Sequence, residues 1–183
     1  MAHVFLSLGS NLGDRVALLR EAVRRLSATS SLRVVHLSPL YETEPWEHAP
    51  GEVPDRDHWF LNCVVAVETT LPPPELLGRV QEIEDALGRT RDPAQTPEAR
   101  RFVARPLDID ILLYDDQVIS VADELHIPHL LMHERAFVLR PLADLAPELE
   151  HPTLYQTIRG LADDLDDPHT VRLAALPADW LEP

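Results

Sequence analysis

Residues 105–113 read Arg105-Pro106-Leu107-Asp108-Ile109-Asp110-Ile111-Leu112-Leu113, an alternation of apolar and polar residues that is typical of a half-buried β-strand. Side chains two apart in a strand point to the same side, so Asp108 and Asp110 should project together. The opposite, buried face would consist of Leu107, Ile109, Ile111 and Leu113. Adjacent carboxylates on such a strand repel each other unless a cation bridges them. Magnesium is commonly held by one or two carboxylates and phosphate oxygens, so the motif favours a magnesium site, with a solvated strand face as the alternative.

Basic residues gather immediately before this strand. They are Arg89, Arg91, Arg100, Arg101 and Arg105. Guanidinium groups bind phosphate through two parallel hydrogen bonds. Next to magnesium-binding carboxylates, such groups supply the charge neutralisation and positioning that phosphoryl-type transfer from a nucleotide requires. The alternative is a solvated basic loop. All 16 basic residues of the chain are arginine, so a Walker-type lysine and a Schiff-base mechanism are excluded.

Outward from this strand, hydrophobic periodicity predicts the order β-α-β-β-α-β in an α+β fold. The predicted strands are 4–8, 32–41, 59–68 and 107–114, with one helix over 16–26 and another that begins at Pro74. This order predicts an antiparallel sheet with helices on one face. An edge strand over 117–119 and a late helix over 153–161 are further predictions. The connections 44–58 and 88–104 are long enough to be active-site loops.

Composition limits the class of protein. A chain of 183 residues with 45% hydrophobic and 26% charged residues predicts one globular domain over 1–183. The net charge of −15 argues against nucleic-acid and acidic-membrane partners. About half of it comes from residues 144–183, with nine acidic residues and two arginines, and 151–183 is predicted to be an acidic C-terminal extension. The single cysteine, Cys63, lies in an apolar run and is predicted to be a core thiol in a reducing cytoplasm. We expect no signal peptide, and we expect a monomer.

Other polar and aromatic residues suggest ligand contacts. His126, His129 and His133 match no H-E-x-x-H pattern, so imidazoles that contact ligand or solvent are predicted instead of a zinc site. Asn62 is an amide in an apolar strand, and its donor and acceptor suit the polar edge of a pterin or purine. The turn 9–13 matches no phosphate-loop pattern and predicts a tight strand-to-helix turn.

Several motifs occur together in a distinctive order. They are Ser7-Leu8-Gly9-Ser10-Asn11-Leu12-Gly13, Tyr41-Glu42-Thr43-Glu44-Pro45, Phe60-Leu61-Asn62, Gly88-Arg89-Thr90-Arg91, Arg105-Pro106-Leu107-Asp108-Ile109-Asp110-Ile111 and Ile127-Pro128-His129. Over about residues 3–150 the chain resembles the 6-hydroxymethyl-7,8-dihydropterin pyrophosphokinase family. The resemblance implies a ferredoxin-like fold and an enzyme of folate biosynthesis that moves a pyrophosphoryl group from ATP to the hydroxymethyl oxygen of the pterin, releasing AMP.

The resemblance also implies residue roles. Asp108 and Asp110 would hold two magnesium ions and act in catalysis with Arg101 and Arg105. The implied pterin-binding residues are Thr43, Pro45, Phe60, Asn62 and Phe137. The implied ATP-binding residues are Gln81, Glu84, Arg89, Arg91, Arg101, Arg105, Ile111, His129 and Arg135. The chain departs from the family pattern at Val103, where a glycine is usual, and at Trp46, where a smaller aliphatic residue is common.

Two other functions fit parts of the pattern. A nucleotide-sugar transferase can also use Asp-x-Asp, and it would release a nucleoside diphosphate without needing a pterin. A ferredoxin-like module that binds a small ligand or RNA would show no turnover. The negative net charge disfavours RNA, and a ligand-binding module would not need paired aspartates.

Overall fold

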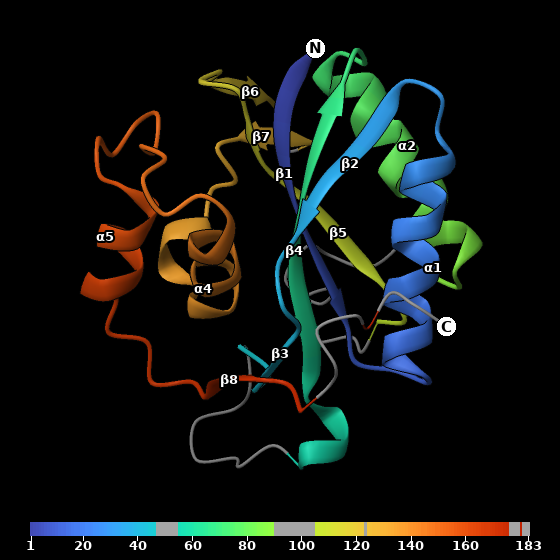
Figure 1. Ribbon diagram of the computed structural model, residues 1–183, viewed down its shortest axis with the longest axis vertical. Helices are drawn as coiled ribbons and strands as arrows, with labels where there is room; N and C mark the ends of the chain where they lie inside the picture. Colours follow the sequence, from blue (N-terminus) through green and yellow to red (C-terminus); the bar gives the residue numbers. More distant parts are fainter. Residues whose placement is uncertain (47–54, 90–104, 123, 176–179, 181–183) are drawn as a thin grey trace.

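The computed structural model describes residues 1–46, 55–89, 105–122, 124–175 and 180 (Figure 1). The N-terminal half contains β1 (Ala2–Ser10), α1 (Arg15–Ala28), β2 (Leu32–Leu37), β3 (Tyr41–Thr43), the 3-10 turn η1 (Arg56–His58), β4 (Phe60–Thr69) and α2 (Pro73–Ala86). The C-terminal half contains β5 (Asp108–Tyr114), β6 (Ile119–Val121), β7 (Leu125–Ile127), the 3-10 turn η2 (Met132–Glu134), α4 (Ala136–Leu145), α5 (Ile158–Asp164) and β8 (Val171–Leu173). The predicted long loops over 44–58 and 88–104 lie largely outside these described residues.

The main sheet is antiparallel, in the order β5-β1-β4-β3-β8, and β2 also pairs with β4. The single strand predicted over 32–41 is therefore two strands. Between them, Ser38 still exchanges hydrogen bonds with Val64 of β4 (Ser38 N to Val64 O 2.9 Å, Val64 N to Ser38 Oγ 2.9 Å). Pro39 follows, and it has no backbone N–H with which to continue the ladder.

Helices cover both faces of this sheet (Figure 1). On one face, apolar residues of α1 and α2 pack on the strands, as the periodicity predicts. The prediction of helices on one face only is wrong for the whole chain, because α4 and α5 pack on the other face against Val64 and Leu112. The stripe that could have predicted α4 is Ala136, Val138, Leu139 and Leu142. Pro141 obscures it, since proline is disfavoured inside helices.

A β-bulge in β5 changes which of its side chains face each layer of helices. Ile111 pairs with Leu6 and Leu113 pairs with Phe5, so Leu112 is an extra residue between two regular stretches. Leu107, Ile109 and Ile111 do face the α1–α2 layer, as predicted. Leu113 does not, because the bulge turns it with Leu112 into the α4–α5 layer.

Local chemistry explains several element boundaries. Asp14 caps α1 by accepting a hydrogen bond from Ala17 N at 3.0 Å. Proline occupies the first turn of α2, and Gly88 just beyond its end has φ +96°, a conformation that favours glycine. Cys63 is fully buried, and burial raises its pKa to about 12, which confirms the predicted core thiol.

The segments after β5 differ from the predictions. The predicted edge strand is instead β6, which pairs with β7 in a separate two-stranded sheet. The late helix α5 begins at Ile158, within the predicted range. The C-terminal extension also adds β8 to the edge of the main sheet beside β3, and Trp180 packs into the α1–α2 core. No helix among the described residues is long and apolar enough to cross a bilayer.

Candidate active site

Asp108 and Asp110 lie at the end of β5, beside Gly9 and Ser7 of the central strand β1. Because no bulge separates them, both carboxylates project to the same side of the strand, on the face opposite Ile109. This is the face that α4 covers farther along the sheet. This face of β5 therefore has two aspartates at one end and buried leucines at the other. The prediction that Asp108 and Asp110 project to the same side is confirmed.

Arginines surround Asp108. Arg105 Nη1 donates to Asp108 Oδ2 at 2.5 Å, and Arg89 donates to Oδ1. Burial alone would raise the pKa of Asp108, but the charges of Arg105 and Arg89 hold it below its usual value. Asp108 is therefore ionised, and it is bound by the guanidinium groups of Arg89 and Arg105. The family resemblance had implied that both arginines bind ATP.

Glu84 of α2 supports this cluster of charged side chains. Its side chain is only 2% exposed, and its Oε1 accepts hydrogen bonds from Arg89 and from the backbone N of Ile109, the latter at 2.8 Å. Burial acts to lower the pKa of Arg89, but the carboxylates of Asp108 and Glu84 raise it above its usual value. Glu84 thus ties α2 to β5 and fixes the guanidinium of Arg89 beside Asp108.

Asp110 differs from its neighbour. Burial and the charge of Asp108 raise the pKa of Asp110, and the nearby His129 and Arg135 only partly offset this. Burial also lowers the pKa of His129. An ionised Asp110 would therefore be stabilised by an additional cation.

The pair suits magnesium in its chemistry. Two carboxylates on one strand face provide two hard oxygen ligands, and phosphate oxygens and water usually complete a magnesium shell. No group of three or more histidine, cysteine, aspartate or glutamate side chains with metal-binding geometry occurs among the described residues. The two carboxylates therefore fit a metal that is shared with a phosphate ligand.

A buried amide lies next to this acidic pair. Asn62 of β4 is 4% exposed and pairs with Gly9, which pairs with Asp108 on its other side. Asn62 Nδ2 donates to Thr43 Oγ1 at 2.7 Å, so β3 orients the amide. A Cβ added to Gly9 would lie 2.5 Å from Asn62 Oδ1. Gly9 therefore makes room for the amide, a role that the sequence analysis missed although a glycine inside a strand often marks such a close approach.

Aromatic side chains border the same region. The guanidinium of Arg135 lies 5.0 Å from the ring centroid of Trp46 and 5.6 Å from that of Phe137. Both distances fit cation–π contacts. Arg135 directly precedes α4, and Trp46 follows Pro45 after β3. The predicted nucleotide residue Arg135 is thus held between the predicted pterin residue Phe137 and the unusual Trp46.

Asn11 is a further residue that sequence reasoning missed. Its Oδ1 accepts from Arg105 N at 2.7 Å, and its own backbone N donates to Arg105 O at 3.2 Å. Asn11 is 7% exposed and therefore fixes the backbone from which β5 begins. The turn over 9–13 contained the signal, but it predicted only a connection between a strand and a helix, and no partner for its asparagine.

Other predicted residues lie apart from this cluster or outside the described chain. Gln81 is exposed on α2, and the side chain of Ile111 packs in the core, 4% exposed. Arg91 and Arg101 lie outside the described residues, as do Phe102 and Val103. Phe60 begins β4 next to Asn62, with its ring 3.8 Å from the Cβ position of Gly9.

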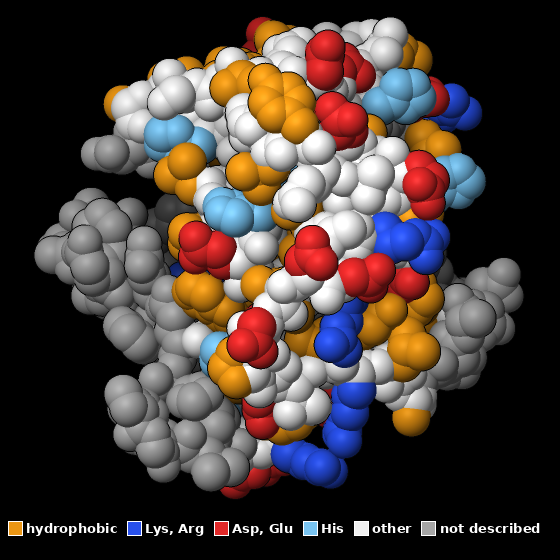
Figure 2. Space-filling view, turned by 90° about the vertical axis from the view of Figure 1, so that its left-hand side faces the viewer, with side chains coloured by type: hydrophobic (Ala, Val, Ile, Leu, Met, Phe, Trp, Pro, Cys, Tyr) orange, Lys and Arg blue, Asp and Glu red, His pale blue; other side chains and the backbone are white. Residues whose placement is uncertain are grey.

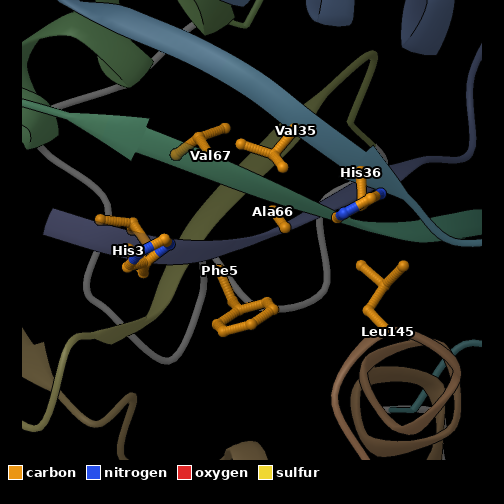
Figure 3. Close-up of a pocket in the computed structure, with 8 residues that line it drawn as sticks. His3, Phe5, Val35, His36, Ala66, Val67 and Leu145 are labelled. Atoms are coloured by element: carbon orange, nitrogen blue, oxygen red, sulfur yellow. The ribbon is translucent and has the colours of Figure 1, made fainter. Parts of the chain in front are cut away.

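A hollow lies at the other end of the same sheet face, away from Asp108 (Figure 3). Phe5 and Leu145 line it, with His3 and His36 at its sides. It contains none of the predicted site residues. The convergence of charge and hydrogen bonding around Asp108 therefore marks the better candidate for an active site.

Comparison with known proteins identifies the family. The family model of 7,8-dihydro-6-hydroxymethylpterin-pyrophosphokinase (HPPK) matches residues 5–147, more than half of the chain. The chain belongs to the HPPK family. An HPPK protein is a transferase of the pyrophosphokinase class in folate biosynthesis, so the family favours this class over a sugar transferase or a binding module.

Curated relatives of the HPPK family span most of the chain. It is 46% identical over 149 residues to 2-amino-4-hydroxy-6-hydroxymethyldihydropteridine pyrophosphokinase of Methylorubrum extorquens, covering 81% of this chain and 85% of that protein. It is 36% identical over 173 residues to the Haemophilus influenzae protein of the same name, covering 94% of this chain and 99% of that one.

Solved HPPK structures share the fold. A crystal structure of Plasmodium falciparum HPPK-DHPS, wild type with pteroate, matches with a TM-score of 0.65 and 20% sequence identity. The match covers 88% of this chain but 42% of that one, so this chain spans less than half the length of that protein. At this identity the likeness shows the fold alone.

Proposed function

We propose that the protein transfers the pyrophosphoryl group of ATP to the hydroxymethyl oxygen of 6-hydroxymethyl-7,8-dihydropterin and releases AMP, with magnesium bound. The observation that carries the proposal is the placement of Asp108 and its two arginines next to the buried amide of Asn62. One end of the sheet thereby offers a phosphate-binding half and a half suited to a polar heterocycle. We propose that residues 1–183 act as one domain and as a monomer.

The strand order supports a ferredoxin-like core. With β2 and β3 taken as one strand, the element order is β-α-β-β-α-β and the two central strands are β1 and β4. This arrangement brings the ends of β1, β4 and β5 together, and these strands carry Gly9, Asn62 and Asp108.

On the nucleotide half, Asp108 and Asp110 would hold magnesium, which neutralises charge on the transferred phosphates. Arg89 and Arg105 would then turn from the Asp108 carboxylate to phosphate oxygens, which their forked donors also fit. Glu84 keeps Arg89 at this position. Arg91, Arg101, His129 and Arg135 are proposed to contact the nucleotide as well, together with Gln81 and the backbone of Ile111.

On the pterin half, Asn62 would donate to and accept from the polar edge of the ring, with Thr43 fixing its orientation. Phe60 and Phe137 would stack on the two faces of the ring, and Pro45 would close one side. These contacts would direct the hydroxymethyl oxygen toward the β-phosphorus for in-line attack, with AMP as the leaving group.

The reaction products test this proposal. We expect the protein, incubated with Mg-ATP and 6-hydroxymethyl-7,8-dihydropterin, to release AMP in equal amount to pterin diphosphate. Chromatography of the nucleotides measures this. Omitting the pterin should abolish AMP release, and chelating magnesium should do the same. Release of ADP, or AMP release that does not depend on the pterin, would contradict the proposal.

The close approach at Gly9 gives a second prediction. In Gly9→Ala the new methyl would lie against Asn62 Oδ1, and Thr43 restrains the amide from moving away. We expect the Kd for the pterin to rise by about tenfold, the size of one well-made hydrogen bond to the ligand. Mg-ATP affinity should stay near its wild-type value. Isothermal titration with each ligand measures both.

Gly78→Ala is the matched control. Gly78 lies within α2, and a Cβ there meets nothing within 4 Å. This variant should leave both affinities unchanged and stabilise the helix by about 0.5–1 kcal/mol. If Gly9→Ala bound the pterin as well as Gly78→Ala does, the proposed orientation of Asn62 would be wrong.

A further inference from the structure

The C-terminal extension reaches the proposed substrate site. The family model ends at residue 147, and α5, β8 and the segment between them lie beyond it. Acidic side chains are scattered over this side of the molecule, which is consistent with a solvated surface (Figure 2). Asp167 is an exception, because its side chain is only 3% exposed.

Asp167 holds the start of α4. Its Oδ2 accepts a hydrogen bond from Ala136 N at 3.0 Å, one of the N–H groups that a helix leaves without an internal partner. The residue at the N-cap, Arg135, contributes no side-chain cap. A carboxylate at this place also interacts favourably with the helix dipole. Asp167 thus fixes the turn that carries Arg135 and Phe137.

The same carboxylate also orders the chain on the other side of the site, near Trp46. Asp167 Oδ1 accepts from His169 N at 3.0 Å and from the His169 ring at 2.5 Å. The His169 ring lies 6.3 Å from the ring of Trp46, centroid to centroid. The next residue, Thr170, pairs with Glu44 in both directions, with Glu44 N to Thr170 O 3.0 Å and Thr170 N to Glu44 Oε2 2.8 Å. The segment 167–170 therefore fixes the chain from Glu44 to Trp46.

We propose that Asp167 and His169 are positioning residues for the pterin: they set the spacing between the Thr43–Trp46 wall and the Arg135–Phe137 wall of the site. The inference rests on the proposed function. One buried carboxylate bonds to both walls directly or through a single residue, and the cation–π contacts of Arg135 with Trp46 and Phe137 bridge the same two walls. Asp108 and its two arginines lie at the start of β5 and just after α2, elements outside the two walls that Asp167 holds.

Asp167→Ala tests the inference through a comparison of two substrates. Loss of the carboxylate frees both walls, so we expect the KM for the pterin to rise by about tenfold or more while kcat changes little. The KM for Mg-ATP should rise by a clearly smaller factor, because Arg135 is the proposed nucleotide residue that lies on the freed turn, whereas Glu84 and Asn11 hold the phosphate half of the site. Asp167→Asn keeps an acceptor for Ala136 N and should recover part of the loss. Asp166→Ala, an exposed neighbour, is the control and should match the wild type.

His169→Ala decides the matter if Asp167→Ala does not fold. It leaves the bond between Asp167 and Ala136 N in place and removes the ring that bonds to Asp167 and lies beside Trp46, so the KM for the pterin should still rise. Equal losses for both substrates, or wild-type pterin KM in both variants, would overturn the inference. The wild-type protein in the same assay separates the two proposals: without pterin-dependent AMP release the proposed function fails, whereas a wild-type KM for the pterin in all variants refutes only the positioning role.

Discussion

Asp110→Asn should lower turnover by about 100-fold or more, the loss seen when one group that stabilises transition-state charge is removed. The amide keeps the size of the side chain but supplies a neutral oxygen in place of a charged metal ligand. Steady-state AMP formation at saturating Mg-ATP and pterin measures the effect. The Mg-ATP affinity should fall as well, since the metal would then be held by Asp108 alone.

The stability of Asp110→Asn should not fall with its turnover. The pKa of Asp110 is raised in the folded protein, so its ionised form costs folding free energy at pH values above the ordinary carboxyl pKa. The neutral amide removes this cost, and we expect the free energy of unfolding at pH 7 to stay level or increase. Asp116→Asn, an exposed aspartate just past β5, is the control and should change neither property. A variant of Asp110 with near-normal turnover would show that the metal role is wrong.

Asn62→Ala should weaken pterin binding far more than nucleotide binding. The change removes a buried donor and acceptor, and leaving ligand groups without partners costs about 1–3 kcal/mol, roughly a five- to 150-fold rise in Kd. The Kd for Mg-ATP should change by less than about twofold. Titration calorimetry with each ligand separately gives both constants.

A second variant separates contact from orientation. Thr43→Val keeps the shape of the side chain and removes the oxygen that accepts from Asn62 Nδ2. It should weaken pterin binding less than Asn62→Ala, because the amide itself remains. Equal losses of pterin and ATP affinity in Asn62→Ala would indicate structural damage, and the proposed reading of the pterin edge would then be wrong.

Local patterns predicted the parts of this structure that depend on near neighbours. Alternation along residues 107–111 placed both aspartates on one face, and that placement follows from strand geometry alone. The apolar stripes of α1 and α2 likewise follow from helical spacing. The arginines before β5 were predicted to lie near the aspartates, and Arg89 and Arg105 do so.

Features that depend on distant pairing were not predictable in this way. The orientation of Leu113 depends on the bulge against β1, which no pattern within β5 reveals. The cap of α4 comes from Asp167, 31 residues along the chain, so the helix start had no local signal. The need for glycine at position 9 arises from Asn62 on a neighbouring strand. Each of these contacts is set by the tertiary fold.

The bulge at Leu112 divides β5 into two segments, and in each segment the pairing with β1 sets which side chains point to each face of the sheet. A residue gained or lost at Leu112 alters only the bulge, because the stretches on either side keep their own pairing with β1. The same change between Asp108 and Asp110 would put the two aspartates on opposite faces and turn one of them into the hydrophobic core, since side chains alternate with a period of two. We therefore expect β5 to tolerate a one-residue insertion or deletion at the bulge and not between the two aspartates.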